Sequence, residues 1–209
     1  MTVDEPVADI LARLEGLTAE HVLADAAARY AGRIAFFTTL GVEDQIVTHL
    51  IAEGGLRVPV FTVDTGRLLA ETHDLIERTS ARYGVSIAVY SPNSADVELM
   101  VKRSGINLFR NGAFERGLCC EARKTKPLRR AQVGLDAWFC ISRDERGVLS
   151  RPRVVAEWDT SAGLVRIDPL ATWDDKGVWD YVSAHDVPYN PLHDQGFETI
   201  DCAPCALRA

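Results

Sequence analysis

No long hydrophobic run opens this sequence. Residues Met1 to Ile10 carry acidic side chains and no continuous apolar stretch, whereas a signal peptide needs an apolar core and a membrane helix needs about 20 apolar residues. We therefore expect neither segment, no contact with a membrane, and a cytoplasmic protein. Cysteine is scarce, with five residues, and an odd number without a secretion signal is typical of a reducing compartment, where thiols are free to bind metal.

Positive charge is also in short supply. The chain has 23 Lys and Arg against 30 Asp and Glu, a net charge of −7 and a sequence pI near 5.3. This balance argues against an extended nucleic-acid surface, because neutralising a phosphate backbone needs a basic face. Any anionic ligand must instead meet a local basic pocket.

Repeats, low-complexity tracts and linkers are absent as well, so we expect one domain over residues 1–209. The hydrophobic content of 47% is enough for one core. Residues Asp144 to Arg153 are charged and punctuated by proline and glycine, which predicts a loop.

Helical and strand-like segments alternate along the chain. Apolar residues three and four apart predict two amphipathic helices within residues 7–27. Strand-like runs follow at Ile34 to Phe37, Val58 to Val63, Ser86 to Tyr90 and Ala137 to Ile141, and helical stretches at Glu43 to Glu53, Leu68 to Tyr83, Glu121 to Val133 and Trp173 to His185. The alternation predicts an α/β fold, a mostly parallel twisted sheet with helices on both faces. We expect Leu164 to Ile167 to add an edge strand, and Thr172 or Asp174 to cap the last helix.

Four of the five cysteines stand in two close pairs, Cys119-Cys120 and Cys202-x-x-Cys205. Thiolates grouped in this way are what a zinc ion or an iron-sulfur cluster needs. Buried cysteines without a ligand are the alternative. Adjacency within the first pair weakly favours a cluster, since the commoner zinc spacing leaves at least two residues between ligands.

Two turns follow predicted strands, at the edge where ligands bind in open parallel sheets. In the segment Thr38 to Asp44, Gly41 permits a tight turn, and the next helix offers free amides to an anion. An ordinary strand-to-helix turn is the alternative, because the segment has one glycine and no Walker lysine. In Asp64-Thr65-Gly66-Arg67, the acid is suited either to a ribose hydroxyl or to capping.

The segment that begins at Cys119 is the one strongly cationic stretch. Residues 119–130 carry five basic side chains and one acid. If a helix starts here, Lys124 lies one turn beyond Cys120 and directs its charge toward the cysteines or a ligand beside them. A solvated helix face accounts for Arg129 and Arg130.

These motifs together resemble one family. The segments that carry the resemblance are Thr38 to Asp44, Asp64 to Arg67 with Glu71-Thr72, Cys119-Cys120 with Arg123-Lys124, Gly134 to Trp138, Glu157 to Asp159, Pro169 to Trp173, Asn190 to Leu192 and Cys202 to Cys205. The chain is similar to the assimilatory sulfonucleotide reductases of the iron-sulfur type, which reduce adenosine 5′-phosphosulfate to sulfite and AMP with thioredoxin as electron donor. The resemblance implies an adenine-nucleotide α-hydrolase-like fold.

The resemblance also implies a set of ligands. Cys119, Cys120, Cys202 and Cys205 would bind a 4Fe-4S cluster. Substrate would be bound by Thr38, Thr39, Gly41, Glu43, Asp44, Asp64, Gly66 and Arg67 at the nucleotide, and by Lys124, Arg143 and Arg151 at the phosphosulfate. Because related reductases of the 3′-phosphorylated substrate lack these cysteines, the unphosphorylated substrate is favoured.

Two features depart from the family pattern. The family continues into a tail whose Lys-x-Glu-Cys-Gly motif provides the attacking cysteine, whereas this sequence stops at Ala209, so we expect the nucleophile to be absent and assign no catalytic residue. The family's arginine-rich loop is altered here at Ile141 to Gly147, where Arg143 is retained. Cys140 precedes this loop, and an apolar run should bury it, raise its pKa and restrict access to it.

Other functions stay open on the sequence alone. One is an adenylating enzyme related to the ATP pyrophosphatases, although Thr39 to Asp44 matches only part of the Ser-Gly-Gly-x-Asp-Ser loop of that class. Another is a non-catalytic nucleotide-binding or redox-sensing protein. The oligomeric state, including a homo-oligomer, is also left open.

Overall fold

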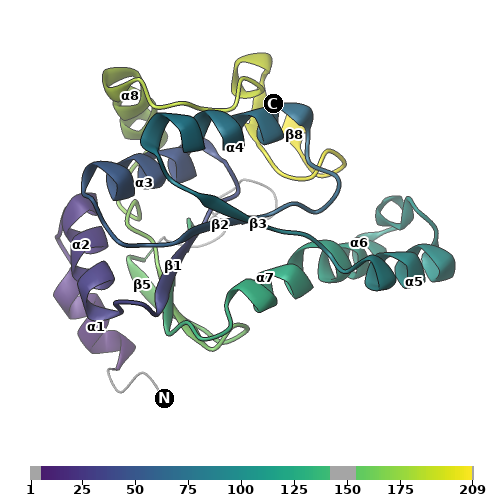
Figure 1. The fold of residues 1–209 in the computed structure, drawn as a ribbon, viewed down its shortest axis with the longest axis horizontal. Coiled ribbons are helices and arrows are strands. Elements are labelled where there is room, and N and C mark those ends of the chain that lie inside the picture. The colour runs from purple at the N-terminus through teal and green to yellow at the C-terminus, as the bar shows by residue number, and fades with distance from the viewer. Residues whose placement is uncertain (1–5, 142–153, 209) are drawn as a thin grey trace.

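The computed structural model describes residues 6–141 and 154–208. Its main sheet has six strands in the order β3-β2-β1-β4-β6-β5 (Figure 1). The strands are β1 (Ile34–Phe37), β2 (Val60–Val63), β3 (Ile87–Tyr90), β4 (Ala137–Phe139), β5 (Ala156–Asp159) and β6 (Leu164–Ile167). All neighbouring pairs run parallel except β5 and β6. The predicted α/β fold with a mostly parallel sheet is confirmed.

The edge of the sheet differs from the prediction. The segment Leu164–Ile167 forms an inner strand, because β5 pairs antiparallel outside it, with Ala156 opposite Ile167 and Asp159 opposite Leu164. No run of apolar residues marks β5, whose sequence is Ala-Glu-Trp-Asp. A short edge strand with one covered face gives little hydrophobic signal.

Eight α-helices are present in the described residues. They are α1 (Val7–Leu14), α2 (Ala19–Arg29), α3 (Val42–Glu53), α4 (Ala70–Tyr83), α5 (Ser94–Ser104), α6 (Ala113–Cys120), α7 (Lys126–Ala131) and α8 (Asp175–His185). Short turns η1 (Leu108–Arg110) and η3 (His193–Gln195) and a small hairpin, β7 (Phe197–Thr199) with β8 (Leu207–Arg208), complete the set. The cap of α8 is Asp174, whose carboxylate accepts the Gly177 amide at 2.7 Å. None of the described helices is both long and apolar enough to cross a membrane.

The cysteine pair at Cys119-Cys120 does not start a helix, contrary to expectation. It ends α6, and the chain continues through a π-helical turn, η2 (Glu121–Thr125), into α7. The helices α5 and α6 were not predicted, and they form an arm beside the sheet (Figure 1). Their small core of Met100, Leu108, Cys119 and Ala122 is local to the arm, so the apolar pattern is sparse.

Helices cover both faces of the sheet, as predicted. On one face α1, α2, α3 and α8 pack against the larger core, which includes Phe36, Phe139 and Ile167. On the other face α7 packs over a smaller, aromatic layer. Within this layer the Phe37 ring lies 5.5 Å from that of Phe61 and 6.0 Å from that of Trp138, measured between centroids.

After α8 the chain returns across α4 toward the sheet edge, held by buried hydrogen bonds. Gln45 donates from Nε2 to Thr79 Oγ1 at 2.6 Å and to the Pro188 carbonyl at 2.8 Å. Asn190, which is fully buried, donates from Nδ2 to Thr72 Oγ1 at 3.1 Å and accepts the Leu192 amide. These contacts direct the C-terminal segment, with its cysteine pair, back over the strand ends.

We predict that Asn190→Ala lowers the free energy of unfolding by about 1–3 kcal/mol, because it leaves buried polar partners without their hydrogen bonds. Urea denaturation followed by circular dichroism measures this change. Gln195→Ala, at an exposed amide in the same segment, is the control and should stay within about 0.5 kcal/mol of wild type. Equal effects of the two substitutions would contradict the anchoring role of Asn190.

Candidate active site

The loop after β1 is held in a strained conformation by its own side chains. Leu40 has a φ of 64°, which is unusual for a residue other than glycine, and it is fully buried. Its amide donates to Thr38 Oγ1 at 3.0 Å. Asp44 Oδ2 accepts the Thr39 amide at 2.7 Å, the Thr39 hydroxyl at 2.6 Å and the Gly41 amide at 3.3 Å. Asp44 therefore shapes the loop from within.

Burial gives Asp44 an altered ionisation. It raises the pKa of this carboxyl group from 3.8 to about 6, against the opposing effect of the hydrogen bonds from Thr39, and the nearby Glu43 raises it further. Glu43 is itself buried in the first turn of α3. At neutral pH the Asp44 carboxylate is charged and accepts hydrogen bonds from three donors of the loop.

The loop after β2 uses its acid to stabilise a turn. Asp64 Oδ1 accepts the Gly66 amide at 2.8 Å, and Oδ2 lies 3.1 Å from His73 Nε2. Gly66 has a φ of +70°, which favours glycine. Arg67 donates to the Ile106 carbonyl at 2.5 Å, and its guanidinium carbon lies 5.0 Å from the centre of the Phe109 ring. Of the two predicted roles of Asp64, the geometry favours capping, here of a turn.

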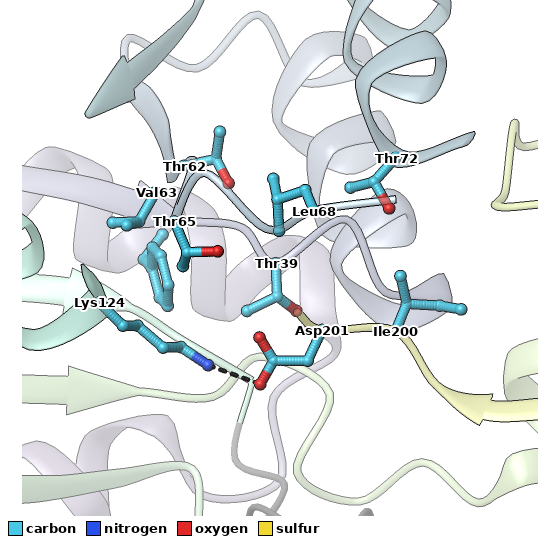
Figure 2. Close-up of a pocket in the computed structure, with 10 residues that line it drawn as sticks. Thr39, Thr62, Val63, Thr65, Leu68, Thr72, Lys124, Ile200 and Asp201 are labelled. Atoms are coloured by element: carbon cyan, nitrogen blue, oxygen red, sulfur yellow. Dashed lines mark hydrogen bonds and ion pairs between the residues drawn. The ribbon is translucent and has the colours of Figure 1, made fainter. Parts of the chain in front are cut away.

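A pocket opens where β1 and β2 end, which we call the strand-edge pocket (Figure 2). It is lined by Phe37, Thr39, Thr62, Val63, Thr65, Leu68, Thr72, Lys124, Ile200 and Asp201. Threonine hydroxyls and an aromatic ring are suited to a nucleoside, and Lys124 offers positive charge to a phosphate. Ligands of open α/β sheets bind at this edge.

A second pocket adjoins the first, and we call it the cysteine pocket. It is lined by Thr65, Arg67, Phe109, Arg116, Cys119, Cys120, Arg123, Lys124, Asp201, Cys202, Pro204 and Cys205. All four paired cysteines thus meet at one place, from the end of α6 and from the C-terminal segment. Within residues 6–141 and 154–208, no three His, Cys, Asp or Glu side chains gather closely enough to hold a single metal ion.

Positive charge predominates around the cysteines. Four cations, Arg67, Arg116, Arg123 and Lys124, line this pocket with a single carboxylate, Asp201. Arg123 is buried and donates from Nη1 to the Thr65 carbonyl at 2.8 Å, while its buried Nε has no hydrogen-bond partner among the described residues. A buried cation is costly without negative charge nearby, so the pocket is suited to an anionic occupant.

The C-terminal cysteines are tied to the rest of the pocket by short contacts. Thr65 Oγ1 lies 3.0 Å from Cys202 Sγ, and the Ala203 amide donates to the Arg67 carbonyl at 2.8 Å. Burial and the neighbouring Asp201 raise the pKa of Cys202 to about 12, and burial also raises the pKa of Cys205. A metal centre bound here would supply positive charge directly at the sulfur atoms and so favour the thiolates.

Lys124 and Asp201 stand between the two pockets. Both residues line both pockets, and Lys124 Nζ donates to Asp201 Oδ2 at 2.9 Å, as the dashed line in Figure 2 shows. Burial alone would lower the pKa of Lys124, but Asp201, Cys202 and Cys120 outweigh it and raise the pKa. Lys124 is therefore charged at neutral pH.

The structure separates the predicted site residues into groups. Thr39 and Lys124 line the strand-edge pocket, and Arg67 lines the cysteine pocket with the four cysteines. The other predicted contacts of the two loops are Thr38, Gly41, Glu43, Asp44, Asp64 and Gly66, which belong to the loops' own framework or to the start of α3 and line neither pocket. Arg143 and Arg151 lie outside the described residues.

Several lining residues were not predicted. Thr62 interrupts the apolar run of β2, and Thr65 lies in the Asp64 to Arg67 turn that directly follows this strand, a position that could have shown it at the strand end. Ile200 and Asp201 carry no such signal, because only the return of the chain brings them here.

Cys140 is separate from the two pockets. Burial raises the pKa of its thiol to about 12, with a contribution from the charge of Asp44. The prediction of a raised pKa is confirmed, and a thiol of this kind is a poor nucleophile at neutral pH.

The raised pKa of Asp44 predicts that the stability of the protein depends on pH, which tests the structure of the loop after β1. The folded protein keeps the Asp44 proton up to about pH 6, whereas the unfolded chain releases it near pH 3.8. The stability that this proton contributes is therefore present at pH 4 and lost as the pH rises through 6. We predict that wild type loses about 2–3 kcal/mol relative to Asp44→Asn between pH 4 and 7. Urea denaturation of both proteins across this range measures the difference, and a difference independent of pH would refute the assignment.

Comparison with known proteins places the chain in a family. Residues 33–208 match the phosphoadenosine phosphosulfate reductase domain. The chain is 42% identical over 172 residues to the adenosine 5′-phosphosulfate reductase of Allochromatium vinosum, covering 82% of this chain and 67% of that protein. It is 36% identical over 197 residues to the enzyme of the same name from Burkholderia cepacia, covering 94% and 78%.

A solved structure supports the same fold. Phosphoadenylyl-sulfate reductase from Candida auris, determined as a phosphate complex, matches with a TM-score of 0.81 at 24% identity, over 99% of this chain and all of that one. The fold, the matched domain and the sequence identities agree, and we conclude that this chain belongs to the phosphoadenosine phosphosulfate reductase domain family, among the adenosine 5′-phosphosulfate reductases.

Proposed function

We propose that this chain binds adenosine 5′-phosphosulfate and takes part in its reduction to sulfite and AMP. The observation that carries the proposal is the shared position of Lys124, which lines both the strand-edge pocket and the cysteine pocket. Relatives named for this reaction share 36–42% of their aligned residues with the chain. A cation at the end of a nucleotide-binding edge suits the phosphosulfate group, which is anionic.

The proposed pose follows from the chemistry of the strand-edge pocket. The nucleoside lies along the ends of β1 and β2, near Phe37 and the threonines, and its phosphosulfate points toward Lys124. Countering the charge of the sulfonate oxygens makes the sulfur more electrophilic. Arg143 and Arg151, which lie outside the described residues, are proposed as further contacts to this group.

We propose a 4Fe-4S cluster as the occupant of the cysteine pocket. Its ligands would be Cys119, Cys120, Cys202 and Cys205, and the surrounding cations match the net negative charge of four thiolates with iron and sulfide. The proposal does not need three ligands to converge on one ion, because in such a cluster each cysteine would bind its own iron atom. When bound, the cluster would supply a concentrated negative charge that tunes Lys124.

The reaction needs a thiolate and a dithiol donor. A cysteine thiolate attacks the substrate sulfur, an S–S bond forms, the bond from sulfur to the bridging oxygen breaks, and AMP leaves with that oxygen. A thioredoxin-type dithiol then attacks the cysteine sulfur and releases sulfite, and its second thiol closes the donor's disulfide and restores the cysteine. We leave the attacking cysteine unassigned, since four cysteines line their pocket and the raised pKa of Cys140 makes its thiol a poor nucleophile.

The proposed setting of this reaction is the cytoplasm. Both a free thiolate and a cluster bound through cysteines require a reducing compartment.

We predict that anaerobically purified protein contains about four iron and four sulfide per chain. Serine at any one of Cys119, Cys120, Cys202 or Cys205 removes a ligand and should abolish most of the iron content, whereas Cys140→Ser should leave it unchanged. Iron and sulfide assays with visible absorbance spectra measure both. Stoichiometric zinc in the purified wild-type protein would contradict the proposed cluster. A loss of iron in Cys140→Ser, with iron kept in the four other serine variants, would contradict the ligand set.

We also predict that AMP and adenosine 5′-phosphosulfate bind more tightly than the 3′-phosphorylated nucleotide. The strand-edge pocket has one cation, Lys124, among its described lining residues. We assign Lys124, Arg143 and Arg151 to the phosphosulfate, so that no described lining residue offers a second cation to a 3′-phosphate. Isothermal titration calorimetry with the three ligands compares their affinities, and it depends on binding alone, not on turnover. Equal or tighter binding of the 3′-phosphorylated form would overturn the substrate assignment.

A further inference from the structure

Asp201 forms an ion pair with Lys124, the cation that an anionic ligand of the strand-edge pocket needs. Its Oδ2 accepts a hydrogen bond from Lys124 Nζ at 2.9 Å, and its Oδ1 accepts the Cys202 amide at 2.8 Å. The backbone contact fixes the carboxylate in place, so that it faces Lys124 across the opening of the strand-edge pocket (Figure 2). Both residues of this ion pair line both the strand-edge pocket and the cysteine pocket.

The pair is accessible to a ligand. The side chains of Lys124 and Asp201 are 31% and 34% exposed, so neither is sealed in the core. Among the described residues that line the strand-edge pocket, these two are the only charged ones. Without a ligand their charges cancel, and a phosphate or sulfonate that enters meets a cation already paired and a carboxylate of its own sign.

We infer that Asp201 sets the affinity and charge selectivity of the strand-edge pocket by competing with the anionic group of the ligand for Lys124. This inference rests on the proposed function, because it takes the pocket to be the nucleotide site. Like charges brought together weaken binding, and a carboxylate displaced from its cation adds to that effect. Asp201 is thus a positioning residue that acts through Lys124.

Two variants remove the charge and keep the backbone contact. Asp201→Asn and Asp201→Ser each retain an oxygen that can accept the Cys202 amide. Asp96→Asn is the matched control, because Asp96 pairs with Lys126 at 2.7 Å but lines neither the strand-edge nor the cysteine pocket. Each protein is purified anaerobically and its iron content is measured, so that a change at the cysteines is detected separately.

Calorimetry with adenosine, AMP and adenosine 5′-phosphosulfate distinguishes the effect of removing the Asp201 charge from the effect of a change in pocket shape. We expect both Asp201 variants to bind AMP about ten-fold more tightly than wild type. For adenosine 5′-phosphosulfate the gain in affinity should be at least as large. Neutral adenosine should bind equally to all proteins, and Asp96→Asn should match wild type. In a Lys124→Met background, Asp201→Asn should increase the affinity for AMP by less than in wild type, because the competition requires the cation and only the repulsion between the carboxylate and the phosphate is left to remove.

The outcomes separate this inference from the proposed function. AMP affinities that are equal in wild type and both Asp201 variants would overturn the inference and leave the proposed function intact. A gain for adenosine as large as that for AMP would also overturn it, since a loosened pocket and not a removed charge would then be responsible. No nucleotide binding by any of the proteins would overturn the proposed function, and the inference with it.

Discussion

Both pockets depend on the buried hydrogen bonds that hold the returning chain against α3 and α4. Gln45 reaches the Pro188 carbonyl and Asn190 reaches Thr72, so polar groups inside the protein are paired between segments far apart in sequence. Such groups are costly to leave unpaired, which fixes one path for the chain beyond α8. That path places Asp201 opposite Lys124 and brings Cys202 and Cys205 to the pair at the end of α6. The site is therefore assembled by the fold's last segment, over a sheet edge that the earlier strands provide.

The fold could be predicted wherever burial leaves a strong local pattern. The strand Ile34–Phe37 is buried along its whole length, and its four apolar residues are enough to identify it. The strand Ala156–Asp159 could not be found in this way, because only Ala156 of its four residues is buried and the edge strand carries no apolar run. The helix that leads to Cys119 was missed for a related reason, since its apolar contacts are made within the small arm and not with the main core.

The site likewise contains residues that a local sequence pattern marks and residues that meet only after folding. Spacing within each cysteine pair is a local signal, and it predicted residues that the structure brings to one pocket. The binding of substrate by Asp44 stays a prediction, and the structure shows a contact that no local pattern indicates, because the Asp44 carboxylate accepts hydrogen bonds from Thr39 and Gly41 within its own loop. Asp201 carries no local signal, because its importance comes from Lys124, a residue 77 positions away. Sequence reasoning finds residues grouped along the chain more readily than residues that meet only after folding.

The π-helical turn between α6 and α7 has a consequence for insertions and deletions. A π turn closes its hydrogen bonds one residue farther along the chain than an α-helix does, so η2 holds one residue more than an uninterrupted helix would. If η2 tightened into a regular α-helix with all its residues kept, the cysteine pair and Leu128 would be rotated by about 100° relative to each other, and if α7 kept its packing on the sheet, the pair would turn away from the C-terminal segment. Deleting one residue from Glu121–Thr125 would instead let α6 and α7 merge into a regular helix with the cysteine pair still facing that segment. A further insertion in this stretch should therefore disturb the cysteine pocket more than a single deletion.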